Sequence, residues 1–287
     1  MKVAILGTGL MGRPMAERLL DAAHTVWVYN RTRAKAKPLA ALGANVVEQP
    51  VDAIRAAEVI VTMLSDAGAF RETILSDEAK EQLARRTVIQ MGTIGPHESL
   101  AFSKEILGVK GDYMEAPVLG STPEATNGKL IIMVGASPVQ FDHWRALLQC
   151  FGPNPVRVGE VPAAATVKLA LNQLIAAEMA GFALSLGFVR RNHVNVDVFM
   201  EILRSSHLYA AMFDRKLPRL LKRHYADPNF PTEHVTKDMG LFLDQAKSLG
   251  LSTQVLEGIK ELLDKTQDMG LTGTDYAAIY EVVDPEK

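Results

Sequence analysis

The feature that most constrains this fold is a glycine-rich turn set between two segments of different periodicity. Residues 2–6 (KVAIL) form a short apolar run that is typical of a buried parallel strand. Residues 7–12 (GTGLMG) follow at once, and residues 13–22 have an amphipathic helical pattern. A GxGxxG turn alone is weak evidence, because ordinary strand-to-helix turns are also rich in glycine. In this setting, it predicts the first βαβ unit of a dinucleotide-binding domain.

Each glycine of the turn has a physical role in holding a pyrophosphate. Gly7 permits the tight turn, Gly9 lets the backbone approach the ligand, and Gly12 lets the helix pack closely against the strand. The free N–H groups at the start of the helix then face the phosphates. We therefore assign to the cofactor site the residues of the turn and two at the end of a later strand, namely Gly7, Thr8, Gly9, Leu10, Met11, Gly12, Met63 and Leu64.

Strands and helices alternate through the first half of the chain. Helical patterns, such as those at residues 35–42 and 77–85, separate apolar or β-branched runs. This alternation predicts a doubly wound parallel sheet of the Rossmann type. We expect this α/β domain to bind a dinucleotide and to cover residues 1–161, with strands at residues 2–6, 25–29, 59–63, 87–90, 112–115 and 130–134.

The strand pattern stops after residue 161. Residues 162–191 contain no break, and Pro162 suits the first position of a helix. The predicted helix is apolar or small nearly all round, so we expect it to be buried on several sides, between domains. Polar residues such as Lys168 and Asn172 argue against a membrane span. Helical patterns continue from residue 196, so we expect residues 162–287 to form an all-helical domain for substrate binding and dimerisation.

Composition excludes several classes of function. The chain of 287 residues has a formal net charge of −2, which argues against a nucleic-acid partner. Its single cysteine and the spacing of its histidines predict neither a disulfide nor a metal site. The first apolar run is too short for a signal peptide, so we expect a cytoplasmic protein with no membrane partner. The alanine- and glycine-rich faces of the long helix predict a homodimer or homotetramer.

The end of the second strand indicates which dinucleotide is bound. An NAD site usually has an acidic residue there, which binds the ribose 2′-hydroxyl. This chain has Asn30, Arg31 and Thr32 instead. A guanidinium binds a 2′-phosphate that a carboxylate would repel. We therefore predict NADPH/NADP+ as the cofactor; the alternative is a solvated basic turn without preference.

Lys168 is the candidate for proton transfer. Hydride delivery to a carbonyl leaves an alkoxide that needs a proton, and lysine can supply one when burial lowers its pKa. Asn172 lies one helical turn further along the same face, so the ammonium and the amide can hold one carbonyl oxygen. The alternative for a lone lysine is a side chain that extends from a buried helix to water.

Four motifs are spread over nearly the whole chain, namely the glycine turn, residues 115–121 (EAPVLGS), residues 167–172 (VKLALN) and residues 236–238 (TKD). Together they resemble the β-hydroxyacid dehydrogenase family. The segments at residues 123–125 (PEA) and 229–231 (NFP) resemble the glyoxylate/succinic semialdehyde reductase branch of that family most.

The resemblance implies a role for each residue that matches the family pattern. Lys168 would be the catalytic acid or base, and Asn172 would orient the reacting oxygen. Gly120 and Ser121 would hold the substrate carboxylate, and Thr93 would lie near the nicotinamide and the substrate. Three residues in the C-terminal part would complete the site: Lys237 at the cofactor, Asp238 as a supporting charge in the substrate site, and Phe230 as a pocket wall.

The sequence also departs from the family pattern at the substrate site. Leu119 stands where the family usually has serine, which removes one hydroxyl from the expected carboxylate site. Gly92 and Gly95 lie in a segment that usually reads Met-Ser-Thr-x-Asp. Both departures bear on which substrate fits, and neither involves Lys168.

The resemblance implies NADPH-dependent reduction of small carboxylate-bearing aldehydes, such as glyoxylate and succinic semialdehyde, to hydroxy acids. Two alternatives stay open. One is a dehydrogenase of the 3-hydroxyisobutyrate type that works in the oxidative direction. The other, from a different class, is a non-catalytic NADP-binding sensor, because a fold does not determine a function.

Overall fold

A computed structural model describes residues 1–286, which form two compact units. The first unit covers Met1–Leu169 and the second begins at Ala170. The division therefore falls inside the long helix α9 (Ala163–Arg191), whereas the predicted limit lies at its start. The difference has a physical reason: Ala164, Ala165 and Leu169 on the first turns of α9 are buried and belong to the first unit.

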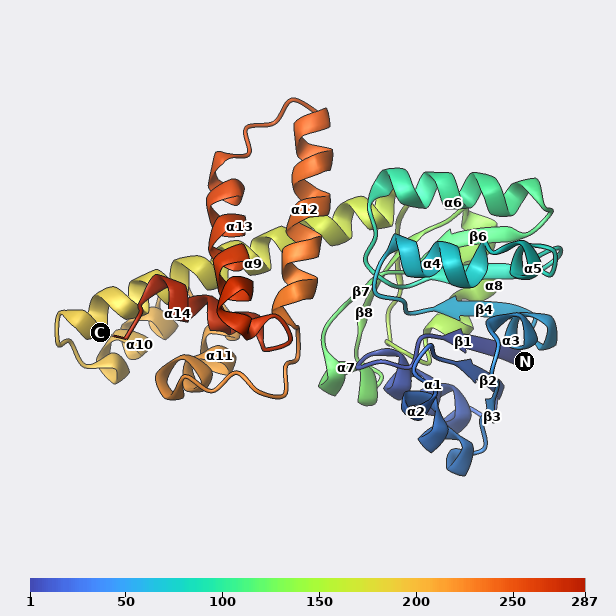
Figure 1. The fold of residues 1–287 in the computed structure, drawn as a ribbon, viewed down its shortest axis with the longest axis horizontal. Helices are drawn as coiled ribbons and strands as arrows, with labels where there is room; N and C mark the ends of the chain where they lie inside the picture. Colours follow the sequence, from blue (N-terminus) through green and yellow to red (C-terminus); the bar gives the residue numbers. More distant parts are fainter. Residues whose placement is uncertain (287) are drawn as a thin grey trace. The chain divides into compact units, whose positions relative to one another are not determined.

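A mostly parallel sheet forms the centre of the first unit (Figure 1). Its strands follow the order β3-β2-β1-β4-β5-β6-β8-β7, and the run from β3 to β6 is parallel throughout. The predicted Rossmann class is thus confirmed. The strands of this parallel run are β1 (Lys2–Leu6), β2 (Thr25–Tyr29), β3 (Asn45–Val46), β4 (Val59–Thr62), β5 (Thr87–Gln90) and β6 (Asp112–Glu115).

The far edge of the sheet differs from the prediction. Strand β8 (Ile131–Gly135) runs antiparallel to β6, and the short β7 (Val118–Leu119) pairs with it. A parallel return needs a crossover connection, usually a full helix, but the link between β6 and β8 contains only β7 and the five-residue helix α7 (Thr122–Thr126). The sequence patterns also missed β3, β7 and β9 (Val156–Gly159), of which β9 lies beside β8.

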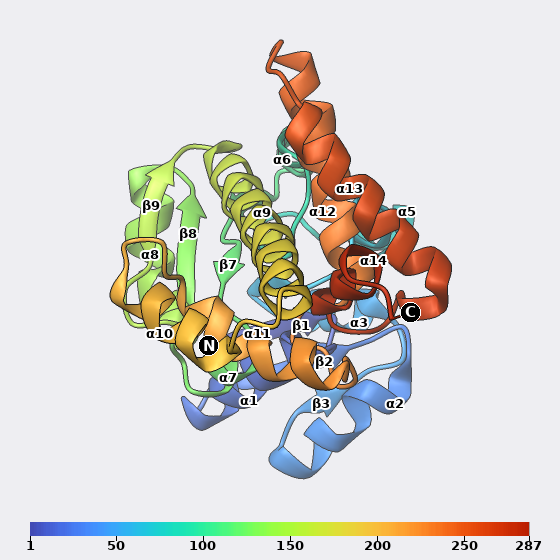
Figure 2. The same ribbon diagram turned by 90° about the vertical axis from the view of Figure 1, so that its left-hand side faces the viewer.

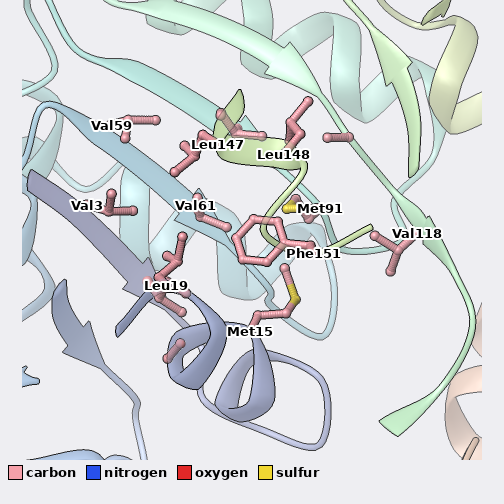
Figure 3. Packing of buried hydrophobic residues seen from close by; sticks show 14 of the residues in the cluster. Val3, Met15, Leu19, Val59, Val61, Met91, Val118, Leu147, Leu148 and Phe151 are labelled. Carbon is pink, nitrogen blue, oxygen red and sulfur yellow. The ribbon is translucent and has the colours of Figure 1, made fainter. Parts of the chain in front are cut away.

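Helices cover both faces of the sheet and close a core on each side. Figure 3 shows one of these cores, where Val3 and Val61 from the strands meet Met15 of α1 and Phe151. The predicted helix at residues 35–42 is α2 (Arg33–Ala36) followed by a 3₁₀ segment (Lys37–Leu42), since Pro38 cannot donate a backbone hydrogen bond. The other helices of this unit are α1 (Gly12–Asp21), α3 (Pro50–Ala56), α4 (Ala67–Ile74), α5 (Asp77–Lys80), α6 (Pro96–Gly108) and α8 (Pro138–Leu148).

The second unit consists of helices and the loops that join them over its described residues, as predicted. Helices α12 and α13 run side by side (Figures 1 and 2) and pack on one core with α9, α11 and the C-terminal segment. Its elements after α9 are α10 (Val196–Ser205), α11 (Ala211–Lys222), α12 (Thr232–Ser248), α13 (Gln254–Thr266), a π-helical segment (Gln267–Leu271), a 3₁₀ segment (Tyr276–Ile279) and α14 (Tyr280–Val283).

Among the described residues, α9 is the one helix long and apolar enough to cross a membrane, judged by length and composition. The core helix of a globular protein meets the same criterion. We interpret α9 as a core helix, because Ala176, Met179 and Ala183 are buried in the core of the second unit. Lys168 and Asn172, which would be costly in lipid, are buried on it as well.

Candidate active site

The glycine turn lies where a doubly wound sheet binds its ligand. Strands β1 and β4 are neighbours, and the strand order reverses between them, so the carboxyl ends of these strands border the crevice of such folds. Gly7 adopts a positive φ of +99°, and a methyl group on it would lie 2.2 Å from the carbonyl oxygen of Met63. Only glycine therefore lets the turn close against the segment after β4, which carries Met63 and Leu64.

The turn has room for a pyrophosphate. A methyl group on Gly9 would have no atom within 4 Å, so its backbone faces open space. The first turn of α1 carries no acidic residue, which leaves its N–H groups to an anion. Leu10 is half exposed, whereas Thr8 is buried with its hydroxyl unpartnered. The residues present thus fit a dinucleotide through the backbone at Gly9 and the start of α1, while the side chain of Thr8 points inward.

Asn30 connects the glycine turn to the end of β2. Its Oδ1 accepts a hydrogen bond from the Thr8 backbone N–H at 2.9 Å, and its Nδ2 donates to the carbonyl oxygen of Thr32 at 3.0 Å. Arg31 is exposed and forms no ion pair with another described residue, whereas Arg33 pairs with Glu48 at 2.8 Å. The guanidinium of Arg31 is therefore the group available to a 2′-phosphate.

Lys168 lies in a small pocket of the first unit. The pocket lies at the carboxyl ends of β5 and β6, the same edge of the sheet that carries the glycine turn. The side chain reaches it from the second turn of α9 and is 9% exposed. Thr93, three residues beyond the end of β5 at Gln90, is half-buried. The residues that line the pocket are Gln90, Gly92, Ile94, Glu115, Pro117, Ala165 and Lys168.

Glu115 is the second ionisable residue of this pocket, and the sequence reasoning missed it. Its side chain is 2% exposed, and its Oε2 accepts a hydrogen bond from the backbone N–H of Ala164 at 3.0 Å. Burial raises the pKa of Glu115 above its ordinary value. The motif at residues 115–121 contained this residue, but no local pattern indicates that it reaches α9.

The expected carboxylate site already holds a carboxylate of the protein. The backbone N–H and the hydroxyl of Ser121 both donate to Oε2 of Glu124 at 2.8 Å, while Gly120 beside them is exposed. Ser121 and Glu124 form a capping box at the start of α7, a pattern visible in the sequence as Ser-x-x-Glu. A substrate carboxylate must displace Glu124 to use these two donors.

In the second unit, Asn172 and Asp238 are buried together. Nδ2 of Asn172 donates to Oδ2 of Asp238 at 2.6 Å, and Nζ of Lys237 lies 3.0 Å from Oδ1 of Asp238. A carboxylate only accepts hydrogen bonds, so Asp238 determines which way the Asn172 amide faces. Oδ1 of Asn172 is buried without a hydrogen-bond partner among the described residues, which leaves an acceptor for a hydroxyl or an amine. Phe230 is half-buried and packs edge-on against Tyr276.

Two family models match the chain, one on each side of the start of α9. Residues 2–159 match the NAD-binding domain of 6-phosphogluconate dehydrogenase, and residues 162–283 match the NAD-binding domain of NADP-dependent 3-hydroxyisobutyrate dehydrogenase. Together they cover parts of both structural units, and both describe NAD(P)-binding domains.

Similar proteins match the chain over nearly its whole length. Glyoxylate/succinic semialdehyde reductase 1 of Arabidopsis thaliana is 30% identical over 285 residues, which cover 99% of this chain and 98% of that protein. 2-Hydroxy-3-oxopropionate reductase of Escherichia coli is 27% identical, with 99% and 97% covered. The crystal structure of 3-hydroxyisobutyrate dehydrogenase from Salmonella typhimurium has the same fold, with a TM-score of 0.88, 21% identity, and 98% and 99% covered. The chain therefore belongs to the β-hydroxyacid dehydrogenase family of NAD(P)-dependent oxidoreductases.

Proposed function

We propose that this protein is a cytoplasmic, NADPH-dependent reductase of small aldehyde acids such as glyoxylate and succinic semialdehyde. The observation that carries the proposal is the buried amine of Lys168 in a pocket at the same edge of the sheet as the glycine turn. The names of the relatives from Arabidopsis and Escherichia coli support the substrate class.

Each residue of the proposed site has its own role in the reaction. When bound, the reduced nicotinamide supplies a hydride to the carbonyl carbon of the substrate. Lys168 then donates a proton to the carbonyl oxygen, so that the product leaves as an alcohol. Asn172, held by Asp238, offers its Oδ1 as a hydrogen-bond acceptor for the hydroxyl that this protonation forms. Thr93 and Phe230 shape the space around the substrate, and Lys237 contacts the cofactor.

Steady-state kinetics test the proposal. We expect NADPH oxidation, followed by its absorbance, with glyoxylate or succinic semialdehyde, and slower turnover of 3-hydroxyisobutyrate with NADP+. Faster turnover in the oxidative direction at saturating concentrations would instead favour the 3-hydroxyisobutyrate type. If none of these substrates causes NADPH oxidation although NADPH still binds, the proposed reductase activity is refuted and a cofactor sensor is favoured.

Cofactor preference provides a sharper test at Arg31. We expect Arg31→Ala to raise the KM for NADPH by about 10- to 100-fold, because a hydrogen bond to a charged group contributes roughly 1.5–3 kcal/mol. The KM for NADH should stay unchanged, since NADH lacks the 2′-phosphate. Arg33→Ala is the matched control, because that guanidinium already pairs with Glu48. An equal rise for both cofactors in Arg31→Ala would contradict the assignment.

Glu124 should weaken the binding of carboxylate substrates. We expect Glu124→Ala to lower the KM for glyoxylate by roughly 5-fold, because it frees the two donors of Ser121 and one hydrogen bond contributes about 1 kcal/mol. An uncharged aldehyde of similar size should show no such gain. If the KM for glyoxylate is unchanged or rises, the substrate carboxylate binds elsewhere.

We also propose that the protein self-associates as a dimer or tetramer. Leu184 and Phe188 on α9 are 64% and 70% exposed, and Ile202 on α10 is 64% exposed, which are large apolar side chains to leave in water. Sedimentation at micromolar concentration should show a dimer or tetramer, and Phe188→Asp should shift it to monomer. A monomeric wild-type protein under these conditions would be evidence against the proposal.

A further inference from the structure

The carboxyl group of Glu115 extends from the sheet to the start of α9. It leaves the last residue of β6 and accepts the backbone N–H of Ala164 at 3.0 Å. Its partner across the antiparallel pair with β8 is Gly135, where a methyl group would lie 2.2 Å from Oε2 of Glu115. Only a glycine at this position leaves space for the side chain to reach the helix.

The start of α9 depends on this carboxyl group. The first N–H groups of a helix have no partner within it and carry a partial positive charge. The first turn of α9 contains no acidic residue of its own. Glu115, which lies 49 residues earlier in the chain than Ala164, therefore supplies the negative partner that a local cap would otherwise provide.

The hydrogen bond at Ala164 holds the part of α9 that carries Lys168. The two residues are four apart on α9 and so lie one above the other on the same face of the helix. Glu115 and Lys168 also line the same pocket. If the first turn frayed or shifted, Lys168 would lose the backbone that directs its amine into the pocket.

The second oxygen of the carboxyl group indicates more than a cap. Oε1 of Glu115 is buried without a hydrogen-bond partner among the described residues, and such a group costs stability. The Ser99 hydroxyl, which shares a hydrogen bond of 2.8 Å with the Tyr113 hydroxyl, opposes the effect of burial and lowers the pKa of Glu115. A buried carboxyl group that lines one pocket with a buried lysine is typical of functional sites rather than of structural caps.

We propose that Glu115 is a positioning residue, which holds the first turn of α9 and thereby keeps the amine of Lys168 directed into the pocket that both residues line. The inference rests on the proposed function, in which Lys168 is the proton donor. It adds a role for the sheet: the end of β6 determines where the proton donor on α9 lies.

Two substitutions separate positioning from folding. Glu115→Ala removes the acceptor of the Ala164 N–H, and we expect kcat to fall by about 10²-fold, the loss that a misplacement of 1 Å can cause. Glu115→Gln keeps an acceptor oxygen of the same reach, so kcat should recover to within about 5-fold of wild type, given that the lost charge weakens one hydrogen bond by roughly 1 kcal/mol. NADPH binding, measured by fluorescence titration, should be unchanged in both variants.

Glu98 provides the matched control. Its carboxyl group accepts the Gly95 backbone N–H at 2.7 Å and so caps α6 in the same unit. Glu98→Ala should lose a similar amount of stability while kcat stays at the wild-type value. An equal fall of kcat in Glu98→Ala and Glu115→Ala would attribute the effect to general destabilisation and overturn the proposal.

Hydrogen exchange provides a readout that does not depend on turnover. Amides at residues 164–168 should exchange at least about 10-fold faster in Glu115→Ala, which corresponds to about 1.4 kcal/mol of lost protection, but not in Glu98→Ala. Faster exchange with an unchanged kcat would overturn the proposal, and so would an unchanged exchange rate. Absence of turnover in the wild-type protein would refute the proposed function instead, and exchange would still show whether Glu115 holds the helix.

Discussion

Replacing Lys168 with alanine is expected to lower kcat by about 10²- to 10⁴-fold, the range that a well-placed general acid contributes. The amine is buried in the pocket at the ends of β5 and β6, so water does not easily replace it. Because the cofactor site at the glycine turn is untouched, the dissociation constant of NADPH should stay near the wild-type value. Steady-state kinetics with saturating aldehyde acid and fluorescence titration of NADPH measure the two quantities.

A second substitution distinguishes a role of Lys168 in proton transfer from a role of its positive charge alone. Lys168→Arg keeps a cation but not a usable proton donor, since arginine stays protonated in proteins. We expect it to be nearly as impaired as Lys168→Ala, whereas alanine at Lys222, an exposed lysine of α11, should leave kcat unchanged. Retention of more than about a third of wild-type kcat in Lys168→Ala would remove the proposed mechanism, because a general acid contributes at least about 10²-fold.

Asp275→Ala is expected to destabilise the second unit by about 3–5 kcal/mol, the usual result of removing one partner of a buried ion pair. Both carboxylate oxygens of Asp275 lie 2.7 Å from Nζ of Lys216, and the two side chains are 0% and 8% exposed. The same carboxylate accepts the backbone N–H groups of Asn229 and Ala277. Removing it leaves a buried ammonium and two N–H groups without their acceptor. Urea denaturation measures the change in the free energy of unfolding. The change is obtained from the transition of the second unit, or from the single transition of the whole protein if unfolding is two-state.

The double variant Lys216→Met/Asp275→Leu is the informative comparison. Replacing both partners with apolar side chains leaves no uncompensated charge, so we expect it to recover much of the stability that Asp275→Ala loses. Activity should not recover in the double variant, because Asp275 also accepts the backbone N–H of Asn229, which precedes Phe230 of the proposed pocket wall. A double variant as unstable as the single one would show that the backbone hydrogen bonds, rather than the ion pair, hold this part of the fold.

Much of the fold could be predicted from the sequence because its determinants are local. The parallel strands at residues 2–6, 25–29, 87–90 and 112–115 have the predicted bounds, since an apolar run between turn residues is a property of a few consecutive residues. The long helix was found within one residue at its start for the same reason. Of the positions where the sequence departs from the family pattern, Gly92 lines the pocket, and Leu119 lies two residues after Pro117, which lines it as well.

The sequence by itself determined the glycine turn, the alternation of the longer strands with helices, and the residues Lys168 and Asn172 as candidates, because periodicity, turn chemistry and motif spacing all operate over short stretches of chain. Tertiary structure alone decided that β8 runs antiparallel, that Glu115 holds the start of α9, and that Lys216 pairs with Asp275. The two side-chain contacts join residues 49 and 59 positions apart. Contacts of that kind depend on where the packed sheet and helices bring the chain together, and no local pattern records that position.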